Sequence, residues 1–212
     1  MSGSLRPWER WDDPGVADAI DRHWRGESLE GQHRGLLTEL VARHVPPACR
    51  LLEVGCGSGY FYEHLVARLP DIRYTGVDTS REMLGLATAR YPGVPFLHGD
   101  GFRLDFANEA FDLVVAFEVL GHLPDIVSPL REMYRVCSTR LLFSVWEGDE
   151  ARDLEESIEN SRFLHRVQTP ADMRGALRTT GILPATVERV PISGSVVAYV
   201  VDKAHPSEIR PA

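Results

Sequence analysis

The feature of this sequence that most constrains its fold is a short apolar run followed by three alternating glycines. Residues 50–54 predict a buried strand, and Gly55, Gly57 and Gly59 follow before a helical pattern begins. Glycine at alternate positions lets the main chain turn sharply and approach a bound molecule, because no Cβ stands in the way. The loop predicts a ligand site at the end of the first strand, with a tight strand-to-helix turn as the alternative.

Strands and helices alternate around this loop. Continuous apolar runs such as 113–117 are typical of strands buried on both faces. The alternation therefore predicts an α/β fold, in which helices cover both faces of a mostly parallel, doubly wound sheet. We expect strands at 50–54, 72–77, 94–98, 111–117 and 141–146, and helices at 60–69, 80–90 and 125–136.

The two ends of the chain add further elements. Helices are expected from Asp13-Pro14 and over 32–45, a polar helix over roughly 149–166, and a helix that Thr169-Pro170 caps and Gly181 ends. Runs 186–190 and 196–202 predict a terminal antiparallel hairpin. We expect one domain over 1–212, divided into a helical cap (1–47), a ligand-binding half (48–148), later helices with the hairpin (149–202) and a tail (203–212).

Composition narrows the possible partners. The 212 residues are 43% hydrophobic and 25% charged, and the net charge of −8 disfavours binding to nucleic acid. The three cysteines have no metal-site spacing, so no metal is expected. No stretch approaches the roughly 18 apolar residues of a membrane span, so we expect no membrane and a cytoplasmic location.

Two carboxylates follow the second and third predicted strands. Asp78 ends the second, where an acid can accept hydrogen bonds from both hydroxyls of a ribose, although it could serve only as a helix cap. Thr79 and Glu82 have the spacing of a capping box. Asp100-Gly101-Phe102 follows the third strand and suits an adenine ring, with a simple Asp-Gly turn as the alternative.

The fourth predicted strand ends in a loop that contains Glu118, His122 and Asp125. Ligands bind at this carboxyl edge of a parallel sheet. His122 could take a proton from a substrate, because an ordinary histidine titrates near neutral pH, or it could hold the loop by hydrogen bonds.

These four segments, in this order, resemble the class I S-adenosylmethionine-dependent methyltransferases, particularly the small-molecule branch that includes quinone-biosynthesis methyltransferases. The resemblance spans about residues 48–148 and implies a seven-stranded sheet in the order 3-2-1-4-5-7-6. It also implies an enzyme that passes the methyl group of S-adenosylmethionine in line to a small-molecule metabolite. The implied cofactor-binding residues include Glu53, Gly55, Cys56, Gly57, Ser58, Gly59, Asp78, Thr79, Asp100, Gly101, Phe102, Phe117 and Glu118.

The sequence departs from that pattern at Gly121, where many members of the family have an acid before the histidine. An acid such as Glu118 would favour a cationic cofactor, and few catalytic residues are needed because a sulfonium is already activated. Arg34, next to His33 in the second N-terminal helix, is a candidate partner for the methionine carboxylate, or a solvated residue. Trp24 and Tyr60 are possible walls, and Trp8 and Trp11 could cover the pocket or pack the N-terminus onto the core.

Two other functions stay open. A nicotinamide-dependent oxidoreductase requires G-x-G-x-x-G, but here the third glycine comes one residue early and Glu53 precedes the first. A non-catalytic adenosyl-binding module would keep the same motifs. Neither the methyl acceptor nor the choice between monomer and homodimer can be read from these residues.

Overall fold

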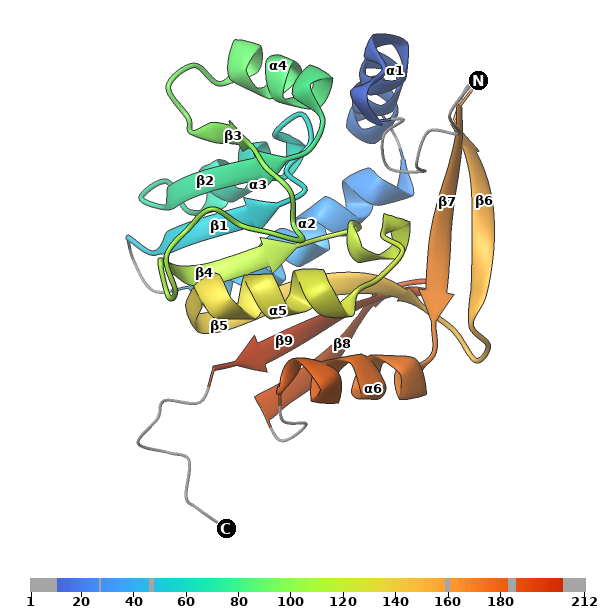
Figure 1. The fold of residues 1–212 in the computed structure, drawn as a ribbon. Helices are drawn as coiled ribbons and strands as arrows, with labels where there is room; N and C mark the ends of the chain where they lie inside the picture. The colour runs from blue at the N-terminus through green and yellow to red at the C-terminus, as the bar shows by residue number, and fades with distance from the viewer. Residues whose placement is uncertain (1–10, 27, 46–47, 159–160, 183–185, 204–212) are drawn as a thin grey trace.

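The computed structural model describes residues 11–26, 28–45, 48–158, 161–182 and 186–203. Its centre is a sheet in which five strands run parallel in the order β3-β2-β1-β4-β5 (Figure 1). This is the predicted arrangement of the first five strands. Their bounds are β1 (Arg50–Val54), β2 (Arg73–Asp78), β3 (Phe96–His98), β4 (Phe111–Ala116) and β5 (Cys137–Glu147).

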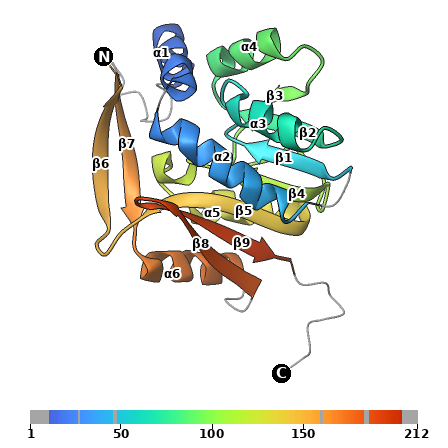
Figure 2. The same ribbon diagram turned by 180° about the vertical axis from the view of Figure 1, so that it is seen from behind.

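Helices cover both faces of the sheet, as the buried strands require. The helices α2 (Leu29–Ala42) and α3 (Tyr60–Arg68) lie on the face seen in Figure 2, and α5 (Val127–Val136) and α6 (Pro170–Thr180) lie on the face seen in Figure 1. α4 (Arg81–Arg90) packs near β3 and β2, and α1 (Pro14–Arg25) stands beside α4.

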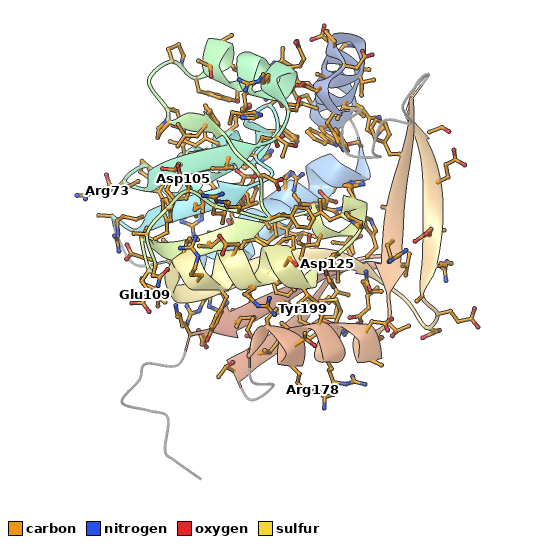
Figure 3. The ribbon with its side chains drawn as sticks, viewed as in Figure 1. Arg73, Asp105, Glu109, Asp125, Arg178 and Tyr199 are labelled. Atoms are coloured by element: carbon orange, nitrogen blue, oxygen red, sulfur yellow. The ribbon has the colours of Figure 1, made fainter. Side chains whose placement is uncertain are left out.

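Side-chain caps set the starts of several helices. Asp13 caps α1, as predicted. Thr169 caps α6, and Gly181 ends this helix, also as predicted; Thr169 and Asp172 form a capping box at its start. The predicted capping box of Thr79 and Glu82 is wrong, because α4 begins one residue later, with Ser80 as its cap. Asp125, labelled in Figure 3, accepts hydrogen bonds from two N–H groups in the first turn of α5.

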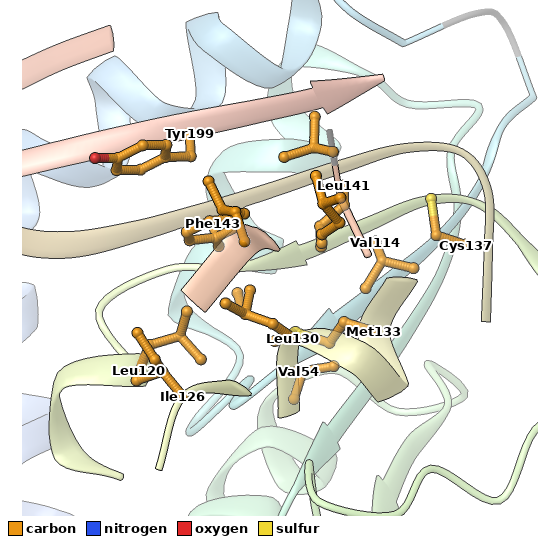
Figure 4. Close-up of a cluster of buried hydrophobic side chains, with 14 of the residues drawn as sticks. Val54, Val114, Leu120, Ile126, Leu130, Met133, Cys137, Leu141, Phe143 and Tyr199 are labelled. Carbon is orange, nitrogen blue, oxygen red and sulfur yellow. The ribbon is translucent and has the colours of Figure 1, made fainter. Parts of the chain in front are cut away.

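The core divides into two layers because neighbouring residues of each strand face opposite sides of the sheet. Leu51 packs under α2 and α3, whereas Leu52 and Val54 pack under α5. Figure 4 shows the second layer, where Leu130 and Met133 of α5 meet Val54 and other strand residues. This packing holds the carboxyl end of β1 rigidly where the glycine loop begins.

The terminal hairpin is present. β8 (Val187–Ser193) and β9 (Val196–Asp202) are antiparallel, and β9 pairs with β5. With β8 and β9 as the sixth and seventh strands of the expected fold, β9 next to β5 and β8 outside it give the order 3-2-1-4-5-7-6, which is confirmed; the strands described next are additional.

The helix predicted over roughly 149–166 is wrong, because the chain forms a second hairpin there. β6 (Arg152–Ile158) and β7 (Ser161–Gln168) are antiparallel, and the end of β7 extends the sheet by pairing with the end of β5. Phe163, His165 and Val167 are buried at every second position, which is the period of a strand and not of a helix. Over the described residues the sheet thus has nine strands, and this hairpin stands beside α1 in Figures 1 and 2.

Candidate ligand site

A pocket lies at the carboxyl ends of β1, β2 and β4, where the parallel strands place their loops. About 900 Å³ of space, part of it open to solvent, lies between the residues of its wall. Most of the predicted site residues meet there. Those that line it are Arg34, Gly55, Gly57, Asp78, Thr79, Asp100, Gly101, Phe102, Phe117, Glu118 and His122.

The glycine loop approaches its neighbours too closely for side chains. Gly55 has φ +76°, and a Cβ there would lie 2.3 Å from a methyl group of Val119. Gly57 has φ +52°, and its Cβ would lie 3.1 Å from the Trp24 ring. The N–H of Gly55 donates to the carbonyl of Val77 over 2.7 Å, which ties the loop to β2. The requirement for glycine is therefore both conformational and steric.

Four predicted cofactor residues are not part of the pocket wall. Glu53 is buried on the other face of β1, where it accepts a hydrogen bond from the Tyr74 hydroxyl over 2.5 Å, and burial raises its pKa to about 8. Ser58 donates to Asp21 of α1 over 2.5 Å. The other two are Cys56, which is buried, and Gly59, which precedes α3 in a left-handed conformation.

Asp78 is held at the pocket edge by main-chain groups. Its carboxylate accepts from the N–H of Gly57 over 2.8 Å and from the N–H of Ser80 over 2.9 Å. Burial raises its pKa above the ordinary value despite these bonds. Each oxygen has accepted one hydrogen bond and keeps further lone-pair capacity, so the carboxylate can still accept from the hydroxyl groups of a ligand.

Asp100 performs a structural role and also faces the pocket. It accepts from the N–H of Phe102 over 2.9 Å, so the Asp-Gly turn considered as an alternative is present. Asp100, Gly101 and Phe102 nevertheless all line the pocket. The turn presents an acidic group and an aromatic ring together.

The centre of charge in the pocket is Glu118. It has φ +58°, a conformation that is costly for a residue with a Cβ and that occurs most often at functional sites. His33 Nδ1 lies 2.8 Å from one carboxylate oxygen, and Arg34 Nη1 lies 3.0 Å from the other. These partners hold the pKa of Glu118 below its ordinary value, although burial, the largest single effect, acts in the opposite direction.

This cluster has incomplete hydrogen bonding. Three buried atoms make no hydrogen bond to the described residues: Arg34 Nε, Arg34 Nη1 and Glu118 Oε2. Arg34 Nη1 and Glu118 Oε2 lie within ion-pair distance of each other, at 3.0 Å. Buried polar atoms in native proteins nearly always have partners. Arg34 Nε is therefore a buried donor that needs a partner, and Arg34 Nη1 and Glu118 Oε2 form an ion pair without the geometry of a hydrogen bond.

His122 lies among aromatic rings. The Trp11 and Trp146 ring centroids are each 5.3 Å from that of His122. Trp146 also explains why residue 121 is glycine, because a Cβ there would lie 2.5 Å from the Trp146 ring. The indole fills the space that the acid found in many class I methyltransferases would need.

Several pocket residues were not predicted as ligand contacts. Trp11 lines the pocket beside Trp24, so it serves as a wall as well as packing on the core, whereas Trp8 lies outside the described residues. Tyr60 is not in the wall; it packs against Arg25. Pro129 and Met133 lie on the apolar stripe of α5, and nothing in the sequence separates such wall residues from core residues.

The described residues contain neither a metal-binding cluster nor a membrane-spanning helix. No group of three or more His, Cys, Asp or Glu side chains there could hold a metal ion. Within the same residues, every helix is too short or too polar to cross a bilayer.

The part of the chain that forms most of the pocket is similar to known proteins. Residues 52–140 match the model of a methyltransferase domain. A demethylmenaquinone methyltransferase of Roseiflexus sp. (strain RS-1) is 36% identical over 120 residues, 55% of this chain and 45% of the relative. A phthiotriol/phenolphthiotriol dimycocerosates methyltransferase of Mycobacterium ulcerans is 31% identical over 162 residues, 62% of this chain and 60% of that protein. The chain spans about half the length of the curated relatives it matches.

Solved structures share the fold over nearly the whole chain. A magnesium protoporphyrin IX methyltransferase from Synechocystis PCC 6803, solved with bound SAM, superposes with a TM-score of 0.70 at 18% identity, covering 96% of this chain and 100% of that one. A SAM-dependent methyltransferase from Aquifex aeolicus gives a TM-score of 0.67 at 18% identity, with coverages of 90% and 98%.

Proposed function

We propose that the chain is a class I S-adenosylmethionine-dependent methyltransferase, which binds S-adenosylmethionine and transfers a methyl group to a small-molecule acceptor; the methyltransferase-domain match over residues 52–140 and the methyltransferases similar to it support this. The pocket of the preceding section is the proposed cofactor site.

The observation that carries this proposal is the incomplete hydrogen bonding of Arg34 and Glu118. An amino acid group has a carboxylate, which accepts hydrogen bonds, and an ammonium, which donates them. Arg34 Nε and Nη1 can donate to the carboxylate, and Glu118 Oε2 can accept from the ammonium. The methionine end of S-adenosylmethionine thus supplies an acceptor to the partnerless Arg34 Nε, and its two charges have the signs that complement the ion pair of Arg34 Nη1 with Glu118 Oε2.

The other wall of the pocket suits the nucleoside end. Asp78 has the remaining capacity to accept from both ribose hydroxyls, because its present donors are two main-chain N–H groups. Asp100 can accept from the adenine amine beside the ring of Phe102. These roles stay proposals that mutagenesis can test.

The geometry around the glycine loop favours this cofactor over a dinucleotide. A nicotinamide cofactor places a diphosphate at the start of the helix after the loop. In this chain Ser58, at that position, is bonded to the buried carboxylate of Asp21, and Trp24 lies against Gly57. Arg25 and Arg90 neutralise Asp21, so the charge there does not decide between the cofactors; the Trp24 indole, which lies against Gly57 where a diphosphate would approach, disfavours the dinucleotide.

The protein's contribution to the reaction is mainly alignment and exclusion of water. S-adenosylmethionine supplies a methyl group already activated by the positive sulfur. His122 lines the pocket, and we propose it as the base that takes the proton from the acceptor. In-line transfer, the identity of the acceptor and this role of His122 are proposals.

Two measurements test the proposal. Calorimetry with S-adenosylmethionine, S-adenosylhomocysteine and NAD⁺ should show binding of the first two; binding of NAD⁺ alone would contradict the assignment. Transfer of a radiolabelled methyl group to any member of an acceptor panel would exclude a non-catalytic adenosyl-binding module. The one-domain division, the monomer or homodimer state, the lack of nucleic-acid binding and the cytoplasmic location stay predictions.

A further inference from the structure

Trp11 is held at the edge of the pocket by two hydrogen bonds, one to its own carbonyl and one to the side chain of the next residue. Its carbonyl accepts a hydrogen bond from the Ser80 hydroxyl over 2.6 Å. The side chain of the next residue, Asp12, accepts from the N–H of Arg81 over 2.6 Å at the start of α4. These bonds tie the segment before α1 to the residues that directly follow Asp78.

The indole of Trp11 has aromatic neighbours and still faces the pocket. Its centroid lies 4.7 Å from that of Phe163 and 6.1 Å from that of Trp24. Both tryptophans line the pocket, but Trp24 already has a cation beside it, because Arg34 Cζ lies 5.9 Å from its ring centroid. Within the part of the chain that the structure describes, no arginine or lysine lies over the Trp11 ring, and the nearest titratable ring is His122, with its centroid 5.3 Å away.

The position of Trp11 in the pocket places its ring near the sulfur of the proposed ligand. Asp78 marks the ribose end of the pocket, and Arg34 with Glu118 marks the amino acid end. The sulfur of S-adenosylmethionine joins the ribose to the amino acid and therefore lies between these groups. Trp11 is anchored beside Asp78, and its ring extends toward Trp24, which lies next to Arg34. The indole thus lies along the stretch where the sulfur belongs.

We propose that Trp11 recognises the positive charge of the sulfonium and therefore contributes more to the binding of S-adenosylmethionine than to the binding of the neutral S-adenosylhomocysteine. This inference rests on the proposed function. The face of an indole carries negative charge and attracts cations, as in the aromatic sites that bind quaternary ammonium groups. Loss of one such contact changes affinity by about tenfold. The two ligands differ in one methyl group and one charge, so the preference reports mainly on the sulfur environment.

Other charged groups contribute to binding without obscuring the test. Asp78 and Glu118 attract the cation, whereas Arg34 opposes them, and His122, which packs against Trp11, would oppose them only when protonated. These residues are unchanged when Trp11 alone is substituted. The change in the ratio of the two dissociation constants therefore isolates the effect of the indole.

The experiment measures both dissociation constants by calorimetry for the wild type, Trp11→Phe and Trp11→Leu. We expect Trp11→Leu to weaken the binding of S-adenosylmethionine about tenfold and the binding of S-adenosylhomocysteine about twofold or less. The affinities of Trp11→Phe should lie between those of the wild type and of Trp11→Leu. Trp146→Leu is the matched control, because Trp146 is outside the pocket wall and its substitution should leave the ratio unchanged.

Equal weakening of both ligands in Trp11→Leu would overturn the proposal and leave Trp11 as a neutral wall. An unchanged ratio in Trp11→Phe and Trp11→Leu together would do the same. If Trp11→Leu fails to fold, the ratio in Trp11→Phe, which keeps an aromatic face of weaker potential, decides the question. A wild-type protein that binds neither ligand would refute the proposed function itself, which separates the two failures.

Discussion

Glu53 offers a quantitative test of the structure, because a carboxyl is buried in the sheet with one hydroxyl partner. Burial raises its pKa from about 4.5 to about 8, against the opposing effects of the Tyr74 hydrogen bond and of Arg34. The folded state therefore disfavours the ionised form. Stability should be greatest below pH 4.5 for this group and should fall as the pH rises toward 8.

The size of the effect follows from the two pKa values. Between pH 5 and pH 8 the unfolded chain releases the Glu53 proton and the folded chain largely retains it. The free energy of unfolding should fall by about 3 to 4 kcal/mol over this range on account of this residue. Glu53→Gln keeps the shape and an oxygen that can accept from Tyr74, but it cannot ionise, so this contribution should vanish.

Urea unfolding at pH 5, 6, 7 and 8 measures the difference directly. The free energies of wild type and Glu53→Gln should diverge as the pH rises, with the variant relatively more stable at pH 8. Tyr74→Phe is the second arm: it removes the hydroxyl that stabilises the ionised carboxylate, so the pH dependence should steepen. Parallel profiles for the wild type and Glu53→Gln would refute the argument that the carboxyl is buried and protonated.

Three further predictions concern the pocket. Asp78→Ala should weaken the binding of S-adenosylmethionine by roughly 1 to 3 kcal/mol, the scale for a lost buried polar partner. An unchanged affinity, measured by calorimetry, would show that Asp78 does not bind the ribose. Arg34→Lys keeps a charge near Glu118 but loses the planar fork. It should weaken S-adenosylhomocysteine about tenfold and leave 5′-methylthioadenosine, which lacks the amino acid, unaffected; equal loss for both ligands would contradict the carboxylate role. Gly121→Ala should destabilise the fold by about 1 to 3 kcal/mol, because its Cβ overlaps Trp146, and a thermal-unfolding midpoint equal to that of the wild type would contradict that packing.

Local sequence patterns predicted the structure correctly where interactions between residues close in the chain determine it. The glycine loop, the parallel strands around it and the helix starts at Asp13 and Thr169 depend on main-chain sterics, hydrophobic periodicity and capping. The same patterns failed over 149–166. That stretch is polar enough to suggest an exposed helix, and only the pairing of β6 with β7 and β5 shows that alternate residues are buried.

The candidate site shows the same division. Asp78 and Asp100 could be placed from their positions after strands, because parallel strands end at one edge of a sheet. Glu53 could not, because its side chain leaves β1 on the face opposite the pocket, and its partner Tyr74 comes from another strand.

The sequence by itself determined the alternation of strands and helices, the glycine loop and the edge where a ligand binds, because these follow from interactions between residues that are near in the chain or repeat with a regular period. The order of the strands was expected only from the resemblance to a known family. Only the tertiary structure brought Arg34 against Glu118 and Trp11 to the pocket wall. These contacts join residues from distant parts of the chain. They depend on how α1 and α2 pack against the strand ends, and the incomplete hydrogen bonding they leave is the strongest guide to the ligand.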